Sequence, residues 1–158
     1  MTVATRSLVA LATLLLVATP ARAQKDTSVA ADLAMKEASA SFRRVADEFA
    51  AAATKGDADG CERLISPNMK GRAGAEAVRR VLTERVLPFF ALSGGAGRSE
   101  TIANTTDGFG SQGFVFYRYM QPKAGGAPRP YVLYVVSENG KTVIANVTVD
   151  QLVPGRHQ

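Results

Sequence analysis

The sequence predicts an α+β domain in which three N-terminal helices pack on a four-stranded antiparallel sheet. Two observations support this fold class. Apolar residues recur at helical spacing in the first half of the chain, whereas from Arg98 onward they alternate as in half-buried strands. In the second half, Asn139-Gly140 separates two apolar runs. This dipeptide is a strong β-hairpin signal, because a type I′ turn needs positive φ at both positions.

The first two helices are predicted from their apolar faces and their ends. The first helix carries an apolar face opposite a charged one, formed by Phe42, Val45, Ala46, Phe49, Ala52 and Ala53. Gly56 is expected to end this helix, and Asp57 to cap a short second helix that runs through Ile65. Ser66-Pro67 is expected to end the second helix, because the residue before a proline disfavours helical backbone.

A third helix is predicted from about Gly74, and its core side is formed by Val78, Val81, Leu82 and Val86. Pro88 is expected to end or kink it, and the apolar run 89–92 to fill part of the core. The glycine-rich segment 93–97 is expected to be a plain flexible joint. It lacks the Gly-Lys-Ser/Thr ending of a phosphate-binding loop.

Strands are predicted at about 100–106, 114–121, 129–137 and 141–152, separated by breaks rich in glycine and proline. The tight turn sets the pairing of the last two. One face pairs Glu138 with Lys141, Val136 with Val143, Tyr134 with Ala145, and Val132 with Val147. The other face pairs Val135 with Ile144, Leu133 with Asn146, Tyr131 with Thr148, and Arg129 with Asp150. We expect the first face to pack on the helices, and the second to be half solvent-exposed and half available for contacts.

Residues 1–23 have the pattern of a cleavable secretory signal. Arg6 precedes the apolar run 8–18, and Ala21-Arg22-Ala23 has the small-x-small pattern of a cleavage site. The run is too short to remain in a bilayer as a helix, which needs roughly 20 residues. We therefore expect export, to the periplasm or outside the cell, after cleavage following Ala23. The mature chain would begin with a flexible or helical segment at 24–38, followed by the domain at 39–153 and a disordered tail at 154–158.

Charge and cysteine content limit the classes of partner. The formal net charge is +5, and without the two arginines of the signal it falls to +3, with 17 basic and 14 acidic residues interleaved. We therefore expect no nucleic-acid partner. No second apolar span follows the signal, and residue 24 is Gln rather than a lipid-acceptor Cys, so no stable membrane insertion is expected. The sequons at Asn104 and Asn146 matter only if the source glycosylates secreted proteins.

Candidate catalytic and metal-binding residues are few. His157, the only histidine, lies second from the C-terminus, and Cys61 is the only cysteine. No catalytic triad and no zinc-like ligand set can be built, so we predict no catalytic residue, metal site or cofactor. Cys61 is expected to be a buried small hydrophobe rather than a reactive or intermolecular thiol. Asp150 could be a general base, but the hairpin register favours a pair with Arg129.

Aromatic residues give the stronger indication of a binding site. They concentrate in the second and third strands, where a tyrosine combines apolar bulk with a hydroxyl suited to a pocket mouth or an interface. We predict Tyr117, Tyr119 and Tyr134 as ligand-binding residues, with ordinary strand composition as the alternative. Arg118 is expected at the solvent edge, with an anion clamp as the alternative.

The order of these elements resembles the nuclear transport factor 2-like superfamily of cystatin-like α+β cones. The similar local features are Lys55-Gly56-Asp57 after the first helix and Leu64-Ile65-Ser66-Pro67 after the second, within residues 39–153. The resemblance implies a bent sheet that wraps a long helix to form a cone with a pocket. The small strand pair that usually precedes the third helix has no clear counterpart in residues 68–73.

Two hypotheses for function follow. The resemblance implies an exported, non-catalytic binding or accessory domain for a small apolar ligand or an envelope protein, as a homodimer joined through the open sheet face. The alternative is a small enzyme on a hydrophobic substrate, with Asp150 and a tyrosine as acid–base pair. A buried acid near a tyrosine in a cavity would favour the enzyme, whereas Asp150 lying against Arg129 would remove its best candidate. Fold alone does not decide between them.

Overall fold

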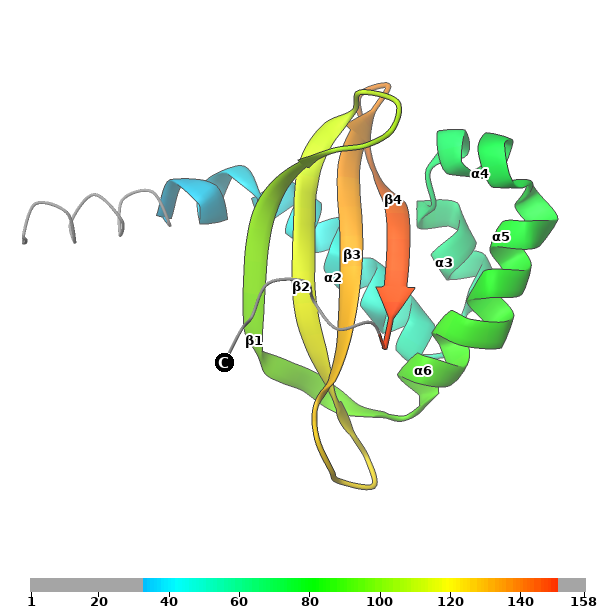
Figure 1. Cartoon of the computed structure of the whole chain (residues 1–158), viewed down its shortest axis with the longest axis vertical. Helices are drawn as coiled ribbons and strands as arrows, with labels where there is room; N and C mark the ends of the chain where they lie inside the picture. The colour runs from blue at the N-terminus through cyan, green and yellow to red at the C-terminus, as the bar shows by residue number, and fades with distance from the viewer. Residues whose placement is uncertain (1–32, 151–158) are drawn as a thin grey trace, which may run out of the picture. The chain divides into compact units, whose positions relative to one another are not determined.

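A computed structural model describes residues 33–150, without the side chains of 96–99. It confirms the α+β class, with helices in the first half and an antiparallel sheet of order β1-β2-β3-β4 in the second (Figure 1). The helices are α2 (Ala40–Thr54), α3 (Ala58–Leu64), α4 (Pro67–Ala73), α5 (Ala75–Val81), the π-helical turn η1 (Leu82–Val86) and α6 (Leu87–Ala91). The strands are β1 (Ser93–Thr106), β2 (Gln112–Pro122), β3 (Arg129–Glu138) and β4 (Lys141–Val149). Residues 33–38 are helical as well, whereas the predicted signal and tail lie outside the described residues.

The long helix α2 crosses one face of the bent sheet and contacts β2, β3 and β4 (Figure 1). Its buried residues are Ala46, Phe49 and Ala53, as the apolar pattern predicted. The helix ends at Lys55, and Gly56 follows with φ +74°, a conformation that glycine adopts without steric cost. Sequence reasoning was therefore correct for this element and its end.

The segment after α3 differs from the prediction. Asp57 caps α3 through a hydrogen bond that Gly60 N donates to Asp57 Oδ1 (2.8 Å). Beyond α3, Ile65 forms a parallel bridge with Ile144, which extends the sheet beside β4. Ser66-Pro67 does more than end α3, because Ser66 caps and Pro67 begins a further helix, α4, in a segment where no element was predicted. Proline is well suited to this first helical position, since its missing N–H would have no partner there.

The third predicted helix is longer than expected. α5, η1 and α6 form one continuous helical run, so Pro88 does not end it. Within η1 the chain takes a wider turn, and Leu87 N–H bonds to the Leu82 carbonyl five residues back. A π-turn of this kind is one way for a helix to continue past a residue that cannot complete the regular ladder. The run brings Phe89 and Phe90 into the core, as predicted for 89–92, but leaves Leu92 half exposed.

The β3–β4 hairpin confirms the turn and half of the predicted register. Asn139 and Gly140 both have positive φ, and the predicted pairs hold from the turn to Val135 opposite Ile144. A β-bulge then shifts the pairing by one residue, so that Tyr134 lies opposite Asn146 rather than Ala145. Bulges insert an unpaired residue without a strong composition signal, which is why the alternating pattern did not predict this one.

The choice of the helix-facing side of the sheet was predicted wrongly. The face that packs on the helices carries Tyr131, Leu133 and Val135 of β3, and not Val132, Tyr134 and Val136. Both faces of β3 are apolar, so alternation along that strand could not identify the inner one. The neighbouring strand β2 determines which face of β3 is buried. Its inner face carries two phenylalanines in register with the buried residues of β3, Phe114 opposite Val135 and Phe116 opposite Leu133.

Aromatic rings fill the space between the inner sheet face and the helices. Phe90 of α6 stacks edge-on against Tyr131 of β3, with ring centroids 5.0 Å apart. At the other end of the sheet, Phe42 of α2 meets Phe114 of β2 at the same distance. Each such pair adds about 0.5–1.5 kcal/mol beyond the area it buries. The interior is therefore occupied by packed side chains, and the cavities of the domain lie at its margins.

The segment 93–97, predicted to be a flexible joint, is instead the start of β1. Its pairing with β2 is irregular, with register shifts between Ser93 and Gly95 and between Ala96 and Glu100. Glycine content misled the prediction, because glycines also mark bulges and close backbone approaches within strands.

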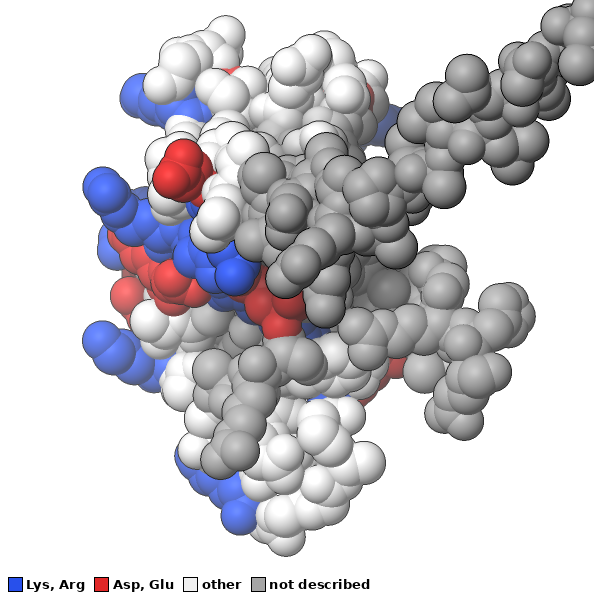
Figure 2. All heavy atoms as spheres, turned by 90° about the vertical axis from the view of Figure 1, so that its left-hand side faces the viewer, with Lys and Arg blue, Asp and Glu red and all other residues white. Residues whose placement is uncertain are grey.

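On the side turned to the viewer in Figure 2, basic and acidic side chains lie next to one another in a mixed band.

Gly113 provides a test of the pairing between β2 and β3. A Cβ at this position would lie 1.9 Å from the Val135 carbonyl oxygen and 2.6 Å from the Val136 Cα, both backbone atoms. We expect Gly113→Ala to lower the free energy of unfolding by about 2 kcal/mol or more, measured by urea denaturation.

Gly71→Ala is the matched control, because a Cβ at Gly71 in α4 meets nothing within 4 Å. This variant should be neutral or should stabilise the protein by up to about 1 kcal/mol. Equal effects of the two substitutions would contradict the strand register.

Candidate functional site

The three predicted tyrosines lie on the outer face of the sheet, away from the helices. Tyr117 lies opposite Val132 and Tyr119 opposite Pro130, and Tyr134 lies opposite Val115, two pairs beyond Tyr117. All three are partly buried. The structure therefore places them on one face but not in one cavity, because Tyr134 alone of the three lines the cavity described next.

The outer cavity is an open hollow of about 540 Å³ bounded by α4, the turn between β1 and β2, and the outer faces of β3 and β4. Its apolar lining includes Met69 of α4, Phe109 of the turn, and Tyr134 and Val136 of β3. Phe109 is 53 % exposed at the rim of this cavity. Sequence reasoning missed this cavity because it depends on α4, which was not predicted.

Polar groups are concentrated at the turn side of the outer cavity. Asp107 Oδ1 accepts hydrogen bonds from Phe109 N (2.9 Å) and Ser111 N (2.8 Å), which hold the turn in shape. Asp107 Oδ2 is buried and has no hydrogen-bond partner among the described residues. Arg72 of α4 lies over the turn, with Nη1 3.6 Å from the point where a Cβ on Gly108 would stand. The outer cavity therefore combines apolar walls with one acidic group, Asp107, and one basic group, Arg72.

A buried carboxylate anchors α4 beside the outer cavity. Glu138, 5 % exposed, accepts hydrogen bonds from Ser66 Oγ and from the Asn68 backbone N–H (3.1 Å). Ser66 Oγ in turn accepts a bond from Met69 N (3.1 Å) and so caps α4. The hairpin pairing of Glu138 with Lys141 was predicted correctly. Its side-chain partners come from a segment about 70 residues away, which no local pattern reveals.

A chain of ion pairs connects α2 to the inner face of the sheet. Arg118 on β2 donates through Nε to Glu100 on the neighbouring strand β1 (2.5 Å) and through Nη1 to Asp47 on α2 (2.8 Å). Glu100 also contacts Arg43 of α2 (2.5 Å). The Arg118 side chain is only 12 % exposed, so the expectation that it lies at the solvent edge was wrong. Arg118 lies on the same face of β2 as Phe114 and Phe116, so it points toward the helices together with them.

Burial and charge act in opposite directions on this cluster. Burial alone would lower the pKa of Arg118, but Glu100, Tyr131 and Asp47 together outweigh it, and the pKa is raised. Burial raises the pKa of Tyr131, and the positive charge of Arg118 opposes that rise without cancelling it. At neutral pH the cluster therefore offers a charged guanidinium beside a protonated tyrosine hydroxyl.

The inner cavity, also of about 540 Å³, opens beside Arg118. Its polar lining residues are Asp47, Thr54, Lys55, Ser93, Arg118 and Tyr131. Apolar side chains of α2, α6 and β2 complete it, namely Ala50, Ala51, Phe90 and Met120.

Asp150 lies against Arg129, as predicted from the hairpin. The Arg129 guanidinium donates to both carboxylate oxygens, with Nε 2.8 Å from Oδ1, and is centred 4.9 Å from the Phe89 ring. The pair holds although the bulge has shifted the backbone register by one residue. The acid–base hypothesis thereby loses its best candidate, because this carboxylate is already engaged at the rim of the sheet.

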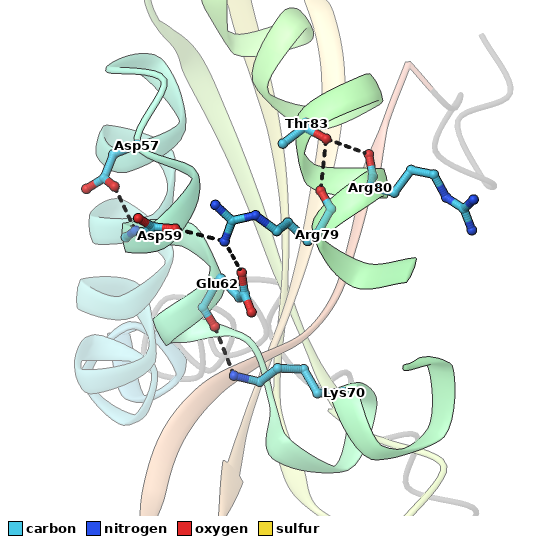
Figure 3. Close-up of polar contacts among 8 residues, drawn as sticks. Asp57, Asp59, Glu62, Lys70, Arg79, Arg80 and Thr83 are labelled. Carbon is cyan, nitrogen blue, oxygen red and sulfur yellow. Dashed lines mark hydrogen bonds and ion pairs between the residues drawn. The ribbon is translucent and has the colours of Figure 1, made fainter. Parts of the chain in front are cut away.

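A second polar cluster joins the helices at the surface. Arg79 of α5 lies between Asp59 and Glu62 of α3, with Nη1 2.8 Å from each carboxylate (Figure 3). Lys70 of α4 donates to the Glu62 carbonyl oxygen (3.1 Å). Arg79 and Asp59 are each more than half exposed, and exposed ion pairs of this kind contribute little. We interpret the cluster as a surface link between helices rather than a binding site.

Within residues 33–150, no three His, Cys, Asp or Glu residues lie close enough together to hold a metal ion. No helix in the same range is long and apolar enough to cross a membrane. Asn104 and Asn146 are both exposed, and His157 lies outside the described residues.

Comparison of the chain with protein-family models, curated proteins and solved structures gave no significant match. Function must therefore be argued from the site geometry.

Cys61 is fully buried, as predicted, and its thiol lies 3.9 Å from the Phe49 carbonyl oxygen. Burial, with a smaller contribution from the Asp57 carboxylate, raises the pKa of the thiol to about 11 from an ordinary value of 9.0. In the unfolded chain the thiol loses its proton at lower pH than in the folded protein. Folding stability should therefore fall as pH rises from about 9 to about 11.

A comparison with Cys61→Ala tests this effect. Between pH 8 and pH 10.5 the wild type should lose roughly 2 kcal/mol more unfolding free energy than the variant, because only the wild type carries the thiol. Urea denaturation at both pH values measures the difference and cancels the titration of other groups. Identical pH dependence in the two proteins would show that the thiol is not held protonated by burial.

Proposed function

We propose that the domain is a non-catalytic binding module that holds a small, largely apolar ligand in the outer cavity. The observation that carries the proposal is the position of Tyr134 within a hollow of about 540 Å³ whose lining is mostly apolar by area. Ligand pockets are commonly of this kind, with apolar walls and a few polar groups that orient the ligand. The exposed Phe109 at the rim would gain a partner when the cavity is filled.

The proposal extends to the setting of this domain. The secretory pattern of residues 1–23 supports export, and the helix α2 crossing a bent sheet supports the resemblance to the nuclear transport factor 2-like superfamily. The engagement of Asp150 by Arg129 favours binding over catalysis. A homodimer through the outer sheet face remains a prediction, for which Tyr117 and Tyr119 would provide contacts.

Binding of the neutral fluorescent probe N-phenyl-1-naphthylamine tests the outer cavity. Tyr134→Ala should weaken its binding by about fivefold or more, because an aromatic wall is removed from the cavity. Tyr119→Ala is the matched control, since Tyr119 lies on the same sheet face but does not line the cavity. Its affinity for the probe should stay within about twofold of the wild type. Equal losses in both variants, or no binding by the wild type, would contradict the proposal.

A further inference from the structure

We infer that the inner cavity is a second binding site, which takes a small carboxylate with an apolar body through Arg118. The ion-pair chain already holds a carboxylate at this position, since Asp47 Oδ1 contacts Arg118 Nη1 at 2.8 Å. In this interpretation the Asp47 carboxylate stands where the carboxylate of the ligand would bind, and it is displaced on binding. The site lies on the opposite side of the sheet from the outer cavity and does not depend on it.

Arg118 is held in place independently of Asp47. Its Nε is bonded to Glu100, which lies directly opposite on β1, and its guanidinium is centred 5.3 Å from the Phe116 ring. Neither of these contacts involves Nη1 or Nη2. If Asp47 moves away, these contacts keep the guanidinium in position, and the Nη1 that Asp47 releases can donate to a ligand. A fixed guanidinium of this kind suits a carboxylate, because a hydrogen bond between two charged groups is strong.

Asp47 is the more exposed of the two acidic residues that contact Arg118. Its side chain is 60 % exposed, compared with 21 % for Glu100, and a single oxygen makes the contact with Arg118. Asp47 therefore loses little when it turns into solvent, whereas Arg118, only 12 % exposed, keeps Glu100 as its partner and exchanges Asp47 for the carboxylate of the ligand. The adjacent α2 backbone does not need to move, because only the Asp47 side chain has to change rotamer.

The rest of the lining favours an organic monocarboxylate. Two basic residues, Arg118 and Lys55, and one acidic residue, Asp47, carry the charge of the cavity, so a single negative group can be balanced once Asp47 turns out. Tyr131 supplies a hydroxyl that burial keeps protonated and able to donate. The remaining wall is hydrocarbon and aromatic, which inorganic phosphate would not use but an alkyl or aryl carboxylate would.

Phenylacetate, followed by amide NMR shifts, is a direct probe. The wild type should bind it, with the largest shifts at the amides of 94–95, 118 and 131, and phenylacetamide and inorganic phosphate should bind at least about tenfold more weakly. Asp47→Asn should tighten binding by about two- to fivefold, because the competing internal carboxylate is removed. Arg118→Lys should weaken it by about tenfold.

Glu48→Gln is the matched control for charge, since Glu48 neighbours Asp47 on α2, is exposed and does not line the cavity. It should leave the affinity for phenylacetate unchanged. The inference is overturned if neither the wild type nor Asp47→Asn binds phenylacetate up to about 10 mM, or if Asp47→Asn and Glu48→Gln behave alike. It is also overturned if the shifts map to Tyr134 and α4, which would assign the ligand to the outer cavity instead.

Discussion

The packing of the inner sheet face on α2 and α6 determines the roles of the other side chains of the sheet. Tyr131 and Leu133 of β3 are buried against the helices, and the Tyr131 ring lies 5.0 Å from that of Phe90. Side chains alternate strictly between the two faces of a strand. Once this face is chosen, Tyr134 must lie outside and Arg118 of β2 must lie inside.

Two chemically different hollows result from that choice. The outer one combines apolar walls with Tyr134 and depends on α4, which Glu138 holds against the hairpin through Ser66 and Asn68. The inner one is lined by charged side chains, among which Arg118 forms an ion pair with Asp47. Because the sheet itself lies between them, a ligand in one hollow has no direct route to the other. The same domain can thus present an apolar site and an anion site independently.

Helix-capping and tight-turn signals in the sequence were reliable, whereas the glycine content of 93–97 was misleading and contacts between distant segments could not be predicted. The cap at Asp57 and the turn at Asn139-Gly140 were predicted correctly, because a few neighbouring residues determine each of them. The inner face of β3 was predicted wrongly, because both of its faces are apolar and the decision rests with β2. α4 and the buried state of Glu138 depend on contacts between segments far apart in the chain. Tyr134 was identified as a candidate from composition, whereas the cavity around it could not be.

Tyr131, and not Tyr134, faces the helices, and the positions of both cavities depend on this orientation. A ¹H NOESY spectrum with assigned aromatic rings measures this directly, since Phe90 lies on α6 and is close to only one of the two tyrosines. We predict cross-peaks between the ring protons of Tyr131 and Phe90, whose ring centroids are 5.0 Å apart. Cross-peaks from Tyr134 to Phe90, with none from Tyr131, would contradict the assignment of the sheet faces and of both cavities.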